Sequence, residues 1–137
     1  ALYRTEPLPL LKLWGRAMAQ IRWDEDRKLI LAPISLEDLV QSRAHAHDLA
    51  LVLEKIRSNF SAATTFALFF QRDTLSVQLL IRCQTHEALS QLHRALPGSE
   101  IQGELLILSF PAASLEQAEV YIHSLIDPLL DIKEVEH

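Results

Sequence analysis

The sequence predicts an α/β domain, spanning residues 1–137, in which helices pack on a mixed β-sheet. Two observations carry this prediction. Segments with the apolar spacing of helices alternate along the chain with short runs rich in β-branched and aromatic residues. The length of 137 residues, with 49% apolar and 23% charged side chains, is typical of a single packed domain. The expected order is α-ββ-α(α)-ββ-α-β-α, with no internal repeat or linker.

The N-terminal part predicts a helix followed by a β-hairpin. Apolar residues recur with helical spacing over residues 8–19, and Pro9 falls in the first turn, where a proline is tolerated. Residues 20–23 and 28–32 are strand-like runs on either side of the polar segment 24–26 (DED). A hairpin turn is the favoured interpretation of these acids, and a cation site is the alternative.

A helix start follows at Ser35, because the next three residues include two acids, which complement the helix dipole. Helical spacing then continues to residue 57, but the polar segment 41–48 interrupts it. The sequence leaves two alternatives open. There is either one long helix, or two helices joined by a short loop with Asp48 as an N-cap.

A second hairpin and a helix come next. Residues 64–71 are rich in β-branched and aromatic side chains, and residues 75–83 form a second strand-like run after a short turn. The helix is expected over residues 85–96. Thr85 caps its start, and Pro97 with Gly98 ends it.

The C-terminal part predicts one strand and one last helix. Residues 101–110 are interpreted as a single strand with a kink at Gly103. Ser114 opens the helix, which is expected to run toward Pro128, since proline disfavours a helix interior. Residues 131–137 are expected to be frayed.

The apolar positions of these elements predict the core. The strand residues expected there are Phe66, Leu68, Phe70, Val77, Leu79, Ile81, Leu106 and Leu108. The helix residues expected to cover them are Leu89, Leu92, Ile122 and Leu125.

Charge and cysteine content exclude several classes of protein. The 18 acids and 13 bases give a formal net charge of −5, which argues against a protein held on nucleic acid mainly by bulk charge. Cys83 is the single cysteine, so no internal disulfide or multi-cysteine zinc site can form, and a buried thiol in a reducing cytosol is favoured. The longest apolar runs are far too short to span a bilayer, and no signal-peptide pattern is present. We therefore expect a cytoplasmic protein without a membrane partner.

No catalytic motif can be defended from the sequence. It contains no G-x-S-x-G turn, and its three glycines are too few for a phosphate loop of the known types. His45 and His47 would share a face only on a strand, and their helical or loop-like surroundings favour a solvated loop over a metal site. We therefore assign no catalytic residue and no metal ligand.

Arg82 is the most informative polar residue. It lies near the end of the predicted strand 75–83, shortly before the helix cap at Thr85. A guanidinium beside the amides of a helix N-terminus suits a phosphate group. The alternative is an arginine at the sheet edge whose head reaches solvent.

Three short motifs, taken in order, resemble those of one known family. Residues 34–39 (ISLEDL) are similar to its I-S/T-x-E-D-L helix start, residues 53–58 (LEKIRS) to its L-R-S-I helix end, and residues 80–83 (LIRC) to its S-L-R-S strand end. The family is that of the DHH phosphoesterases, which holds RecJ-like nucleases and nanoRNase-like phosphodiesterases. The resembling region is the one that follows the catalytic domain, and it covers nearly the whole chain.

The resemblance implies a C-terminal substrate-binding domain, in which a strand-end arginine and a G-G-G-H loop hold the phosphate and base of a nucleotide. The arginine carries over as Arg82, whereas residues 96–100 (LPGSE) take the place of the loop, with one glycine and no histidine. The family's catalytic domain, which binds manganese or magnesium, is absent, so no cofactor is expected in this chain. The candidate ligand-binding residues are Arg82, Cys83, Thr85, Gly98 and Ser99.

Two functions remain open. The first is a degenerate nucleotide- or oligonucleotide-binding domain, a C-terminal fragment of a DHH-type phosphoesterase without catalytic residues of its own. The second is a protein-interaction or dimerisation domain that has lost the ligand site. Its partner could be a second copy of the chain, which would give a homodimer. Arg82 and the segment order favour the first, and the acidic balance and the missing glycine loop favour the second. An independent small enzyme has no nucleophile, metal cluster or cofactor loop to support it.

Overall fold

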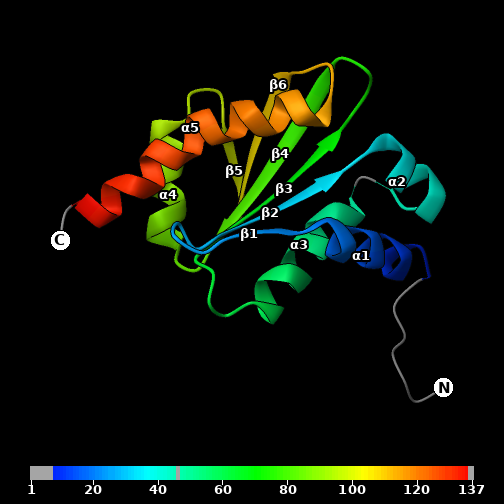
Figure 1. The fold of residues 1–137 in the computed structure, drawn as a ribbon, viewed down its shortest axis with the longest axis horizontal. Helices are drawn as coiled ribbons and strands as arrows, with labels where there is room; N and C mark the ends of the chain where they lie inside the picture. The colour runs from blue at the N-terminus through cyan, green and yellow to red at the C-terminus, as the bar shows by residue number, and fades with distance from the viewer. Residues whose placement is uncertain (1–7, 46, 136–137) are drawn as a thin grey trace.

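The computed structural model describes residues 8–45 and 47–135, with side chains described up to residue 131. It has helices on both sides of one six-stranded sheet (Figure 1). The helices are α1 (Leu8–Gln20), α2 (Leu36–Ser42), α3 (Asp48–Asn59), α4 (His86–Ala95) and α5 (Leu115–Val135). The strands are β1 (Arg22–Asp24), β2 (Leu29–Ile34), β3 (Thr65–Gln71), β4 (Ser76–Cys83), β5 (Glu100–Gln102) and β6 (Leu105–Pro111). The predicted α/β class is confirmed.

The sheet is mixed, as predicted, and its strand order is β1-β2-β3-β4-β6-β5. Strands β2 and β3 are parallel, with Ile30 opposite Phe66, and the other neighbouring pairs within the described residues are antiparallel. Parallel neighbours require a crossover connection, and here α2 and α3 supply it. The crossover carries α3 onto one face of the sheet, which positions its C-terminal half near the end of β4.

Each face of the sheet has its own apolar core. Helices α1 and α3 cover one face, and α4 and α5 cover the other (Figure 1). Neighbouring side chains on a strand point to opposite faces, so Phe69 packs on the α4–α5 side and Phe70 on the α1–α3 side. The predicted core is confirmed: all the residues named for it are buried except Leu125, which is partly buried against the same cluster.

The long helical segment that starts at Ser35 consists of two helices. Ser35 and Asp38 form a reciprocal capping box at the start of α2, and Arg43 ends it in a left-handed conformation with φ of 58°. The suggestion that Asp48 is an N-cap is wrong, because Asp48 is the first residue of α3. Its carboxylate instead accepts a hydrogen bond from the backbone N–H of His45 at 3.0 Å.

The strand expected over residues 101–110 is a hairpin of two strands. Gly103 has φ of +63°, a conformation that suits glycine, and the chain reverses there so that Ile101 pairs with Leu106. The kink predicted at this glycine is therefore a full turn, which places Glu104 at the end of the sheet beside the last residues of β4.

The last helix is longer than predicted. It continues through the exposed Pro128 to Val135, so residues 131–135, which were expected to be frayed, are helical, and residues 136–137 lie outside the described residues. Proline removes one helical hydrogen bond, but Ile126 and Leu130 on either side of it are buried against the sheet, and such packing holds most protein helices in place. In the part of the chain that the structure describes, no helix combines the length and apolar character needed to cross a membrane.

Candidate functional site

A small cavity lies where β4 ends and α4 begins. Its volume is about 190 Å³. The side chains around it come from the end of α3, from the β4–α4 connection and from the β5–β6 turn, and they are Arg57, Arg82, Cys83, Gln84, Thr85, His86, Leu89 and Glu104. Three segments far apart in the sequence therefore meet at this end of the sheet.

The guanidinium of Arg82 lies between two carboxylates. Its Nη1 is 2.6 Å from Oε2 of Glu54, and its Nη2 donates a hydrogen bond to Oε2 of Glu104 at 2.7 Å. Its side chain is 18% exposed. Its Nε is buried and has no hydrogen-bond partner among the residues that the structure describes. The guanidinium of Arg82 is therefore held at the cavity through both of its terminal nitrogens, Nη1 and Nη2.

Glu54 connects Arg82 to a second arginine. Arg57, one turn further along α3, donates from Nη2 to Oε1 of Glu54 at 2.6 Å and from Nε to Oε2 at 3.0 Å. These hydrogen bonds from Arg57 lower the pKa of Glu54; burial opposes them, and the charge of Arg82 adds to them. The same pairing raises the pKa of Arg57. Glu54 therefore stays ionised, and the site is a network of two cations and two anions.

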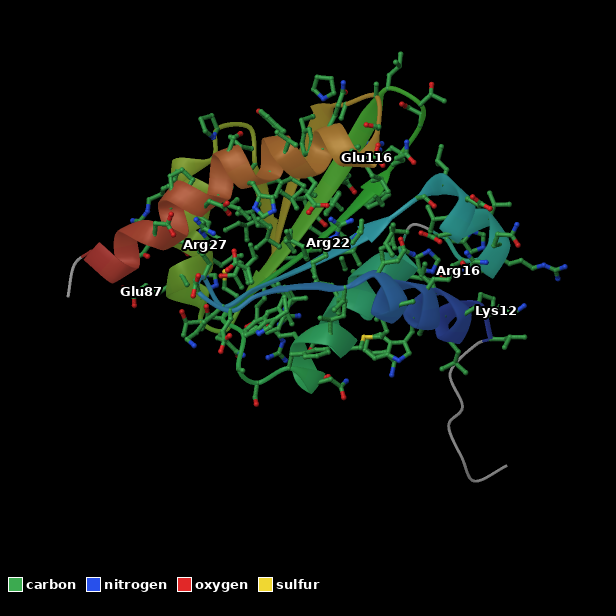
Figure 2. All side chains as sticks on the ribbon, in the orientation of Figure 1. Lys12, Arg16, Arg22, Arg27, Glu87 and Glu116 are labelled. Atoms are coloured by element: carbon green, nitrogen blue, oxygen red, sulfur yellow. The ribbon has the colours of Figure 1, made fainter. Side chains whose placement is uncertain are left out.

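The N-terminus of α4 forms the next wall of the cavity. The hydroxyl of Thr85 accepts a hydrogen bond from the N–H of Ala88 at 3.1 Å, so Thr85 is the cap that the sequence predicts. Glu87 follows in the first turn of α4 (Figure 2). The N-terminus of a helix carries a partial positive charge, which adds to that of the two guanidinium groups nearby.

The structure brings together three of the five predicted ligand-binding residues. Arg82, Cys83 and Thr85 line the cavity. Gly98 and Ser99 lie in the turn after α4 and are not among its lining residues.

The turn that contains Gly98 and Ser99 has its own packing. Gly98 has φ of +86°, and a Cβ there would lie 3.9 Å from Leu108. The hydroxyl of Ser99 donates to the carbonyl of Leu96 at 2.6 Å and contacts Nδ1 of His93 at 2.9 Å. These contacts close the end of α4.

Three residues of the cavity network were missed by the sequence analysis. Glu54 and Arg57 stand three positions apart on a helix, a spacing that predicts an ion pair between them. Nothing in the sequence indicates that this pair meets Arg82, because the meeting depends on how α3 packs against β4. Glu104 reaches Arg82 only because the chain reverses at Gly103.

The other polar clusters have structural explanations. The rings of His45 and His47 are exposed and stack at 5.7 Å, and no group of three metal-ligating side chains occurs within the described residues. The predicted acidic turn after β1 is confirmed: Asp24 binds Arg27, and the guanidinium of Arg27 also lies 2.9 Å from Asp131 of α5. Figure 2 labels Arg27 near α5. Burial tends to raise the pKa of Asp24, but its contacts with Arg27 outweigh this and lower it. The ion pairs of Arg27 therefore connect the β1–β2 hairpin to α5.

The chain is similar to a solved structure, that of an exopolyphosphatase-related protein from Bacteroides fragilis, with a TM-score of 0.73 and 16% sequence identity. The similarity covers 95% of this chain and 38% of that protein's chain. The fold is shared. This chain therefore spans well under half the length of that protein, and at 16% identity the likeness concerns the fold alone. No family model matches the chain, and no curated protein matches it.

Proposed function

We propose that this chain is the ligand-binding domain of a phosphoesterase-related protein and that it holds the phosphate of a nucleotide or short oligonucleotide beside Arg82. One observation carries the proposal: Arg57, Arg82 and the N-terminus of α4 converge on one cavity. Guanidinium groups bind phosphate through paired N–H donors, and helix N-termini bind it through backbone N–H groups. The shared fold with an exopolyphosphatase-related protein supports the same class of ligand.

The proposal assigns ligand binding, and not hydrolysis, to these residues. Metal-dependent cleavage of a phosphoester requires a cluster of carboxylate and imidazole ligands. No such group occurs among the described residues of this chain. Most of the similar protein lies outside the match, which leaves room for a separate catalytic domain with a manganese or magnesium site.

A second candidate function is an interaction or dimerisation domain. The observation that favours it is the pairing of Arg82, whose guanidinium already contacts two carboxylates. If this function is correct, the ion pairs of Arg82 only stabilise the fold, and the cavity binds no ligand. Only a binding measurement separates the two candidates.

The experiment is a calorimetric titration of the domain with adenosine monophosphate, a short oligonucleotide and adenosine. We expect the two phosphate-bearing ligands to bind and adenosine, which lacks a phosphate, to bind far more weakly. Arg82→Ala removes a charge-assisted hydrogen bond worth about 1.5–3 kcal/mol, so binding should weaken about tenfold to a hundredfold. Arg72→Ala is the matched control, since Arg72 is exposed in the turn between β3 and β4. Absence of binding at millimolar ligand would leave the interaction domain as the function.

A further inference from the structure

We propose that Glu104 acts as an internal anion that competes with the ligand phosphate for Arg82, and that Glu54 is the fixed partner of the same arginine. The proposal rests on the function proposed above and concerns what controls the affinity of that site. It follows from the different ways in which the two carboxylates are held.

Glu104 is held by its contact with Arg82 and, less directly, by the charge of Arg57. Its side chain is 68% exposed, against 18% for Arg82. It projects from the turn between two strands, directly after Gly103. A carboxylate this exposed gains less from its ion pair than a buried one does, because water competes for its charge and because a long side chain loses freedom when it pairs. Glu104 can therefore leave Arg82 at a small cost.

Glu54 is held by a rigid element and by more contacts. It lies on α3 and accepts two hydrogen bonds from Arg57, at 3.0 and 2.6 Å, in addition to its contact with Arg82. A two-pronged contact between a guanidinium and a carboxylate is stronger than a single one. Glu54 therefore remains in place and fixes the position of both arginines.

Displacing Glu104 changes the charge of the cavity. With all four groups in place, two guanidinium groups face two carboxylates, and the local charge is balanced. When Glu104 swings away, Nη2 of Arg82 is released and one positive charge is uncompensated, beside the N-terminus of α4. A phosphate group supplies the oxygen atoms that can replace the carboxylate at Nη2. The resident carboxylate therefore lowers the affinity of the site for anions.

The test is a titration with inorganic phosphate, followed by NMR shifts, of the wild-type domain and Glu104→Gln. The amide keeps the size of the side chain and removes its charge. We expect Glu104→Gln to bind phosphate about fivefold more tightly, the effect expected for one nearby charge at a partly solvated site. Glu100→Gln is the matched control, since Glu100 is an exposed acid on β5 and does not line the cavity. It should leave the affinity unchanged.

The outcomes separate this proposal from the one on which it rests. Adding Arg82→Ala to Glu104→Gln should remove the gain. Equal affinities for the wild type and Glu104→Gln, both lost with Arg82→Ala, would overturn the role of Glu104 and leave the phosphate site in place. An equal gain in Glu100→Gln would also overturn that role, because it would reflect net charge alone. If neither protein binds phosphate while both give folded NMR spectra, the proposed function fails.

Discussion

Oε2 of Glu54 lies 2.6 Å from Nη1 of Arg82, and the same oxygen atom accepts a hydrogen bond from Nε of Arg57 at 3.0 Å. One carboxylate on α3 thus joins its own helix to the end of β4. This connection brings two guanidinium groups to the cavity at the start of α4. Two close cations would repel each other without the intervening carboxylate. Glu54 therefore lets two arginines lie at one cavity in a chain whose formal net charge is negative.

The core on each face of the sheet should be equally sensitive to truncation. Phe69 and Phe70 are 0% and 3% exposed and pack on opposite faces. Removal of either ring should lower the free energy of unfolding by about 3–5 kcal/mol, measured by urea denaturation of Phe69→Ala and Phe70→Ala. Leu75→Ala is the control, because Leu75 is 72% exposed and should change stability little. If neither phenylalanine variant melts at a lower temperature, the assignment of β3 as a central strand is wrong.

The capping residue Asp38 should make stability depend on pH in the acid range. Burial alone raises its pKa, but the hydrogen bonds from the N–H of Ser35, from Gln20 and from Arg16 outweigh burial and hold the pKa below the ordinary value of 3.8. A carboxyl group with a lower pKa in the folded state stabilises the fold above the unfolded-state pKa. That contribution is lost as the pH falls through the folded-state value.

Asp38→Asn tests this linkage. At pH 7 the variant should be less stable than the wild type by about 1–3 kcal/mol, since the amide cannot accept from all three donors as an anion does. The difference should shrink as the pH falls below about 4, where the wild-type carboxyl group takes up its proton. Urea denaturation at several pH values measures both effects. A difference that stays constant down to pH 2 would contradict the assigned role of this carboxylate.

The chain by itself should not hydrolyse phosphodiesters. No group of three metal-ligating side chains lies within the described residues, so a metal pair has no obvious place to bind. We expect no turnover of short oligonucleotides or nucleoside bisphosphates in the presence of manganese or magnesium. The assay follows product release by chromatography, with and without a chelator. Turnover that a chelator abolishes would show that this expectation is wrong.

Much of the fold could be predicted because its signals are local. Ser35 and Thr85 cap the helices that follow them, and each contact spans three residues. Two boundaries were predicted wrongly, because local signals alone do not decide them. The apolar residues after Glu104 continue the strand pattern, which therefore predicts a kink at Gly103 rather than a reversal. Pro128 predicts the end of α5, but the helix continues because the residues on either side of the proline are buried. Tertiary packing, which a sequence pattern does not reveal, decides both cases.

The candidate site could be predicted only where its parts are neighbours in the sequence. Arg82, Cys83 and Thr85 follow one another and line the cavity together. Glu54 and Glu104 reach the same arginine from a helix before β3 and from a turn after α4. Their convergence depends on the strand order, in which β4 lies between β3 and β6. The sequence alone therefore could not predict that these two carboxylates contact Arg82.

Phosphate binding beside Arg82 is tested most directly by an NMR titration of the amide-labelled domain with adenosine monophosphate. If the cavity beside Arg82 binds the phosphate, saturable shifts should appear at the amides of residues 82–87, which form the end of β4 and the start of α4. They should weaken as salt is added, because the contact is ionic. The turn at Gly98 and Ser99, which does not line the cavity, should shift little. Shifts confined to that turn, or none anywhere at millimolar nucleotide, would contradict phosphate binding at this cavity.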